Sequence, residues 1–159
     1  MAKATVLSVD NFIKDIDTRT AAFHQIAGKS LYVGAGIIAD ALRKNIENLP
    51  ERAPRLKNGE ISRGVTKYQK EALLKGMGIS KMRNNDGTYD IKIGFQGYDD
   101  EKTKAYPKGH PISMIARSVE SGTSWLQKTP FIRPAYDKAH ASAEEAMKKE
   151  IESQWQTAK

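Results

Sequence analysis

The sequence predicts a single α+β domain over residues 1–159, with N-terminal helices, a small antiparallel β-sheet built on a hairpin, and a long C-terminal amphipathic helix packed on that sheet. Apolar residues recur every three or four positions before residue 50 and again after residue 134, which is typical of amphipathic helices. Between them an Asp-Gly turn joins two short stretches with β-strand character, which predicts a hairpin. A chain of 159 residues suits one hydrophobic core.

Two helices are expected before residue 50. The first spans 8–27 and ends at Gly28, and the second spans 31–48 and ends before Pro50, because glycine and proline often mark helix ends. The apolar positions that line the two helices are Phe12, Ile13, Ile16, Phe23 and Ile26, then Leu31, Ile38, Leu42, Ile46 and Leu49. Residues 50–65 hold prolines, glycines and charges without periodicity, so we expect a long loop there.

A hairpin is expected in the middle of the chain, after a short polar helix over 66–75. Its strands, 79–83 and 88–95, flank the turn Asn84-Asn85-Asp86-Gly87, in which Asp-Gly favours the positive φ angles of a tight turn. Apolar and polar residues alternate along the second strand. One face of that strand should therefore be buried while the other faces water.

The last third of the chain predicts a loop and two helices. Residues 96–111 are rich in charges, glycine and proline and form a second long loop, and a short apolar helix follows over 112–119, ending at Ser121-Gly122. The final helix starts near Pro134, since proline suits a first helical turn. Its apolar stripe consists of Tyr136, Ala139, Ala143, Met147, Ile151 and Trp155. The small alanines would let this helix lie close to a sheet or another helix.

Composition excludes several classes of function. The chain has no cysteine, so disulfides, thiolate metal sites and thiol nucleophiles are excluded. No stretch approaches the roughly 18 consecutive apolar residues of a membrane span, and the N-terminus lacks the apolar stretch of a signal peptide. We therefore expect the chain to stay in the cytoplasm where it is made, without a membrane partner.

Positive charge is concentrated in one region. The net charge is +7, and the segment 49–83 holds nine basic residues against three acidic ones. Such a segment could contact nucleic acid or an acidic protein surface, or could be a solvated loop. The candidate residues for a DNA-facing or interface role are Arg52, Arg55, Lys57, Arg63 and Lys67.

No group of residues converges on a recognisable reaction. Gly34-Ala35-Gly36 has the spacing of a dinucleotide-binding turn, but no βαβ unit surrounds it, and these glycines suit a closely packed helix. The histidines, His24, His110 and His140, have no partner at metal-ligand spacing. No glycine-serine nucleophile motif is present. We expect no catalytic residue, no cofactor and no metal site, and hence no enzyme.

Two segments near the C-terminus combine special backbone residues with apolar anchors. They are Val119-Glu120-Ser121-Gly122-Thr123 and Pro130-Phe131-Ile132-Arg133-Pro134-Ala135. The glycine-threonine turn and the phenylalanine between prolines should fix how the last helix joins the core. Glu120 and Arg133 carry opposite charges that could pair across the turn.

These segments resemble the shared signature of a family of small morphogenesis proteins of long-tailed phages, described as tail-completion, minor tail or head-to-tail joining proteins. The matching positions are Glu120, Gly122, Thr123, Pro130, Phe131, Arg133, Pro134 and Ala135. The chain departs from the family pattern just before the glutamate, where Ile115-Ala116-Arg117-Ser118 stands in place of the usual tyrosines.

The resemblance implies a structural subunit that forms a ring of its own copies, with sixfold symmetry, in the neck of the virion. Its neighbours would be head-closure proteins and tail-terminator or tail-tube proteins, and the ring would line the DNA passage and touch packaged DNA non-specifically. The implied locations are the virion and, during assembly, the host cytoplasm. The alternative from the residues alone is a basic nucleic-acid-binding protein that uses the region 49–83, although among those bases only Tyr68 offers an aromatic ring.

Overall fold

The computed structural model describes residues 8–52 and 61–157, with the backbone alone at 8–19 and 157. The elements within these residues are α1 (Ser8–Glu47), β1 (Ser62–Arg63), α2 (Lys67–Gly76), β2 (Met77–Ile79), β3 (Arg83–Asn85), β4 (Thr88–Asp90), β5 (Ile93–Phe95), α3 (Ile112–Ser121), β6 (Leu126–Gln127) and α4 (Ile132–Thr157). The predicted α+β class is confirmed. No helix in this part of the chain is both long and apolar enough to cross a membrane.

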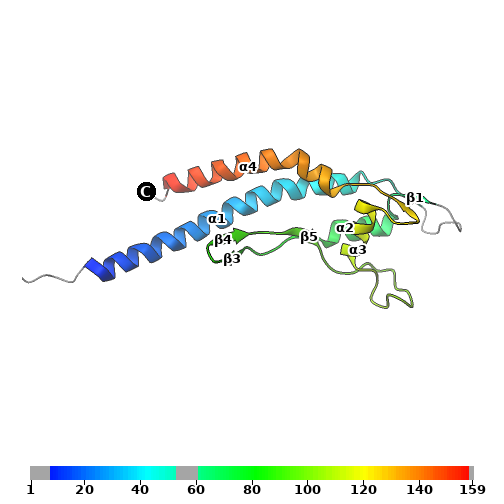
Figure 1. The fold of residues 1–159 in the computed structure, drawn as a ribbon, viewed down its shortest axis with the longest axis horizontal. Helices are drawn as coiled ribbons and strands as arrows, with labels where there is room; N and C mark the ends of the chain where they lie inside the picture. The colour runs from blue at the N-terminus through cyan, green and yellow to red at the C-terminus, as the bar shows by residue number, and fades with distance from the viewer. Residues whose placement is uncertain (1–7, 53–60, 158–159) are drawn as a thin grey trace, which may run out of the picture.

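The molecule is elongated and has two regions (Figure 1). We call the antiparallel pair of α1 and α4, with the β2 to β5 ribbon along the other side of α1, the rod. We call the end where α2, α3, β1 and β6 gather around the last turns of α1 the head. The helix α1 runs the length of the rod into the head and therefore connects the two regions.

A single helix, α1, stands where two were predicted, so the expected break at Gly28 is wrong. A glycine inside a helix costs about 1 kcal/mol relative to alanine, but Gly28 is buried against the ribbon: a Cβ there would lie 3.5 Å from the Met82 sulfur. Ser30 lies inside this continuous helix and donates its hydroxyl to the Ala27 carbonyl at 3.0 Å. The helix continues because tertiary contact outweighs the local stop signal.

The last helix packs on α1, whereas we had predicted that it packs on the sheet. Small side chains make this approach possible. The buried alanines of the two helices are Ala35 and Ala39 in α1 and Ala135, Ala139 and Ala143 in α4. Gly34 is also required, because a Cβ at this position would lie 2.6 Å from the Met147 sulfur. This bears out the interpretation of Gly34 as a packing residue, while a Cβ on Gly36 would meet nothing within 4 Å.

The predicted hairpin is confirmed as a long two-stranded ribbon. Strand β2 pairs with β5 and β3 pairs with β4, both antiparallel. Asp86 and Gly87 occupy the turn with φ angles of 49° and 86°, the two successive positive values that a two-residue hairpin turn needs. The ribbon is fastened to α1, since the Met82 backbone N–H donates to the Tyr32 hydroxyl at 3.2 Å.

The head contains the main hydrophobic core. Its buried residues larger than alanine are Leu42, Ile46, Leu49, Val65, Leu73, Ile112, Ile115, Val119, Leu126 and Phe131. Thr66 caps α2 through the Gln69 backbone N–H, and the Gln69 side chain caps the Thr66 N–H in return, a reciprocal capping box. The helices predicted over 66–75 and 112–119 thus appear as α2 and α3, shifted or extended by one or two residues.

The described ends of the predicted 50–65 loop are tied into the head. Strand β1 pairs in parallel with β6, and Arg52 donates its backbone N–H to the Val65 carbonyl at 2.9 Å. Gly64 has a φ of 89°, and a Cβ there would lie 1.9 Å from the Pro50 carbonyl oxygen. Only glycine therefore fits at this position. The strand was missed because two residues are too few to show periodicity.

Candidate functional site

The carboxylate of Glu120 holds the start of α4. It accepts the backbone N–H groups of Phe131, Ile132 and Arg133 at 2.7, 2.8 and 3.2 Å. A negative charge at a helix N-terminus satisfies N–H groups that have no partner within the helix and faces the positive end of the helix dipole. Glu120 therefore does contact Arg133, but through the backbone, where we had expected an ion pair with the side chain.

The other residues of the C-terminal motif complete this joint. Gly122 has a φ of 78°, and a Cβ there would lie 2.9 Å from the backbone nitrogen of Lys128. Both the backbone angle and the close contact favour glycine at this position. The Thr123 hydroxyl accepts the Leu126 N–H at 3.1 Å, which closes a tight turn. Phe131 is 2% exposed and meets Phe95 edge to face, with ring centroids 6.1 Å apart. These residues together form the connection between α3 and α4. Pro130, Arg133 and Pro134 lie at its surface.

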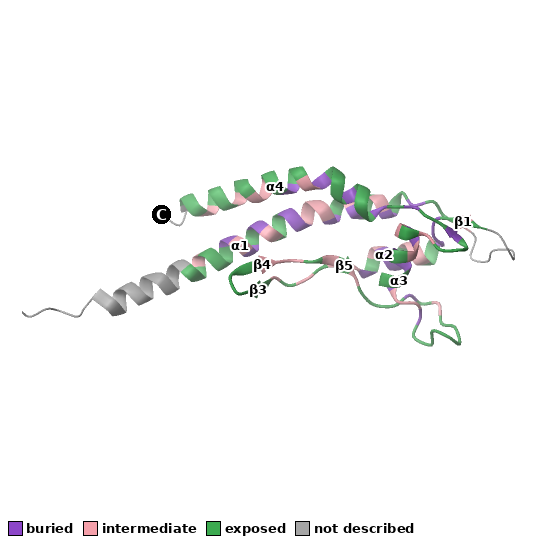
Figure 2. Ribbon diagram, in the orientation of Figure 1, coloured by how far each residue is buried: buried purple, intermediate pink, exposed green. Residues whose placement is uncertain are grey.

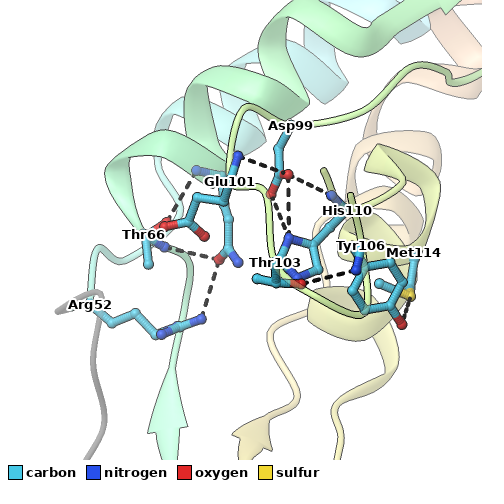
Figure 3. A network of polar contacts seen from close by, with 9 residues as sticks. Arg52, Thr66, Asp99, Glu101, Thr103, Tyr106, His110 and Met114 are labelled. Atoms are coloured by element: carbon cyan, nitrogen blue, oxygen red, sulfur yellow. Dashed lines mark hydrogen bonds and ion pairs between the residues drawn. The ribbon is translucent and has the colours of Figure 1, made fainter. Parts of the chain in front are cut away.

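A second polar cluster lies in the loop 96–111 (Figure 3). The ligating atoms of Asp99, Glu101 and His110 lie within 4.8 Å of one another, a spacing that could hold a metal ion. The expectation that His110 has no partner at such spacing is therefore wrong. Sequence spacing could not reveal the group, because the loop brings together residues that are eleven positions apart.

Hydrogen bonds within the loop already use the Asp99 carboxylate. It accepts the backbone N–H of His110 at 2.6 Å and that of Glu101 at 3.3 Å, and its second oxygen lies 3.2 Å from the His110 Nδ1. Gly109 has a φ of 92°, and a Cβ there would lie 1.9 Å from the Asp99 carbonyl oxygen. These contacts hold the two ends of the loop together, and we call Asp99 and His110 the clasp.

A hollow of about 370 Å³ lies beside this clasp, between α2 and the loop. Its charged lining consists of Glu71, Lys75, Asp99, Asp100 and Glu101. The Asp99 side chain is turned into the clasp (Figure 3), and Tyr68, Lys75 and Tyr98 share the lining with the remaining carboxylates.

The basic candidates have different surroundings. Arg52 is half-buried, donates to the Gln69 side chain at 3.3 Å and lies over the Trp125 ring at 5.6 Å. Burial lowers the pKa of the Arg52 guanidinium, and the negative charge of Glu101 raises it in part. The Arg52 side chain therefore makes contacts within the head, to Gln69 and Trp125.

Of the other four basic candidates, Arg63 and Lys67 are exposed on the head. Arg55 and Lys57 lie outside the described residues. A partner could therefore reach Arg63 and Lys67 without any rearrangement of the head.

Exposed residues occur along every helix of the molecule (Figure 2). Among the described residues, large apolar side chains are more often exposed than buried. Fourteen are exposed: Phe23, Tyr32, Val33, Ile61, Tyr68, Ile79, Tyr98, Tyr106, Met114, Trp125, Ile132, Tyr136, Ile151 and Trp155. Eleven larger than alanine are buried, namely the ten of the head core and Ile26. Scattered exposed apolar residues are ordinary, whereas exposed apolar residues that form a contiguous patch mark an interaction surface.

The two tryptophans lie in different regions of the molecule. Trp125, which is 47% exposed, belongs to the turn before β6 in the head, and Trp155, which is 54% exposed, lies near the C-terminal end of α4, away from the head (Figure 1). The predicted stripe of α4 is therefore buried only in part, at Ala139 and Ala143. Trp125 escaped the sequence-based prediction, although a lone tryptophan in a polar turn is a signal of a contact residue.

Comparisons with protein-family models, with curated proteins and with solved structures found no match to this chain.

Proposed function

We propose that the chain is a structural, non-catalytic subunit of a long-tailed phage particle that assembles into a ring at the neck or tail-completion position. One observation carries the proposal: the described residues expose both tryptophans, one in the head and one near the far end of α4 in an elongated molecule. Interfaces between proteins are enriched in aromatic residues, and two separate contact surfaces on one chain suit a closed assembly. The C-terminal segments that resemble the phage family support the same proposal, because Glu120 and Phe131 hold the start of α4 against the head.

In this proposal the copies form a sixfold ring between head-closure proteins and tail-terminator or tail-tube proteins. The protein would be made in the host cytoplasm and end in the virion. Its energy of assembly would come from repeated apolar contacts between copies, since partner surfaces that exclude water gain from buried apolar area.

Native mass measurement with negative-stain imaging tests the proposal. We expect a single large species with annular particles as the protein concentration rises from about 1 to 100 μM, a range set by micromolar affinities. A chain that remains monomeric throughout that range would contradict the proposal.

The alternative function, nucleic-acid binding, can be tested at Arg63 and Lys67, because both of these basic residues are exposed. We expect at most weak DNA binding that falls steeply with salt, as phosphate contacts do. Arg63→Glu combined with Lys67→Glu should abolish that binding. Tight binding of duplex DNA by a monomer, lost in this double variant, would favour the alternative function.

A further inference from the structure

The tip of the rod carries an apolar groove that nothing in the described structure covers. The groove has a volume of about 610 Å³ and lies between α1, α4 and the turn of the ribbon. We define the rod groove by Phe23, Ile26, Tyr89, Met147, Ile151 and Trp155. Phe23, Ile151 and Trp155 are each between 43% and 54% exposed. Its size fits several large side chains, but it lacks the converging polar groups of a small-molecule site.

The head carries a protruding apolar surface at its far edge. Ile61 is 67% exposed and Trp125 is 47% exposed, and the two are held side by side because the Ser62 N–H donates to the Trp125 carbonyl at 3.1 Å. We call Ile61 and Trp125 the head knob. The β1 and β6 pairing and the Arg52 guanidinium over the Trp125 ring fix its shape. A rigid apolar anchor of this kind loses little entropy on binding.

The charges around the two surfaces are complementary. The charged residues that line the rod groove are Glu144 and Lys148. The stretch of α4 around them, residues 144–156, contains four glutamates and two lysines, and Lys149 is already bonded to Glu145 at 2.7 Å. Arg52 lies over the Trp125 ring of the head knob, and the exposed Arg63 and Lys128 follow Ile61 and Trp125 by two and three residues in the sequence. Opposite charges around an apolar contact favour this pairing and disfavour contact between two like surfaces.

From these observations we propose that the rod groove of one copy receives the head knob of the next copy. The head knob lies in the head, and the rod groove lies by the C-terminal end of α4, which points away from the head (Figure 1), so one chain cannot bring them together. The contact is head-to-tail, and such contacts produce rings when the rotation between copies closes. The inference rests on the proposed ring function and identifies the surfaces that would build the ring.

Two variants, each disabled at one end, test the pairing. Trp155→Glu places a charge in the rod groove, and Ile61→Glu places one on the head knob. Both residues are largely exposed in the monomer, so both variants should fold, with melting temperatures near that of the wild type. Tyr136→Glu is the matched control, because Tyr136 is an exposed aromatic residue on α4 outside both surfaces.

Sedimentation velocity of the separate and mixed variants gives the decisive result. We expect each of the two variants alone to be monomeric, with self-association weakened on the order of 100-fold, as for loss of a central anchor. An equimolar mixture should form a one-to-one dimer and nothing larger, because only one intact groove and one intact knob remain. The control should assemble like the wild type.

Other outcomes separate the two proposals. Rings that persist in Ile61→Glu, or a variant mixture that stays monomeric while the wild type forms rings, would overturn the head-to-tail pairing and leave the ring function standing. A wild type that never assembles would overturn both.

Discussion

The head and the rod of this molecule use apolar residues in opposite ways. In the head, large side chains such as Ile46, Leu73 and Phe131 are buried in a core, as in a self-sufficient domain. In the rod, alanines and a glycine fill the space between α1 and α4, while Phe23 and Trp155 remain at the surface. The head thus supplies its own stability, and the rod offers its apolar surface to a partner.

Loss of Phe131 should produce the largest loss of stability. Phe131→Ala removes a buried ring from the head core, and we expect a decrease of about 3–5 kcal/mol in the free energy of unfolding. Denaturant unfolding followed by circular dichroism measures this decrease. The exposed Tyr136→Ala should change stability by less than about 0.5 kcal/mol. Equal effects of the two substitutions would refute the distinction between a buried and an exposed aromatic residue.

Loss of the Glu120 carboxylate should have the next largest effect. Glu120→Ala leaves three backbone N–H groups at the start of α4 without their acceptor, and we expect a loss of about 2–3 kcal/mol. Glu120→Gln retains one oxygen acceptor and should lose less. The hydrogen-exchange rates of the Phe131 and Ile132 amides should rise in both variants. Unchanged exchange in Glu120→Ala would show that the joint does not depend on this residue.

Substitution by alanine at two glycines of α1 should change the free energy of unfolding in opposite directions. Gly36→Ala adds a Cβ that meets nothing within 4 Å, so we expect stabilisation of about 0.5–1 kcal/mol from helix propensity. Gly34→Ala forces its Cβ against Met147, and overpacking costs about 1–3 kcal/mol, so the net change should be destabilising. Thermal unfolding of both variants provides the measurement. Stabilisation by Gly34→Ala would mean that α4 can move away from α1 at little cost.

Local signals predicted the elements whose geometry is set by neighbouring residues. The turn at Asp86 and Gly87 and the cap at Thr66 are of this kind, since their hydrogen bonds and backbone angles depend on residues nearby. The break at Gly28 was predicted wrongly because its outcome depends on Met82, which is distant in the sequence. The Asp99 and His110 clasp escaped prediction for the same reason.

The contact surfaces were predictable only in part. The periodicity of α4 indicated an apolar stripe that includes Ile151 and Trp155, but periodicity cannot tell whether the facing element belongs to the same chain or to another. Ile61 and Trp125 lie in irregular segments where no periodicity exists. Their proximity arises from the two-residue pairing of β1 with β6, which is too short to be recognised from sequence.

Acrylamide quenching of tryptophan fluorescence over a dilution series tests most directly whether the two exposed ends are the contact surfaces. The chain has two tryptophans, one at each surface, so Trp125→Phe and Trp155→Phe leave a single reporter in the rod groove or on the head knob. We predict that each remaining tryptophan is readily quenched in dilute protein and shielded in concentrated protein as the native mass rises. A rise in mass with either tryptophan still fully accessible to acrylamide would contradict the account.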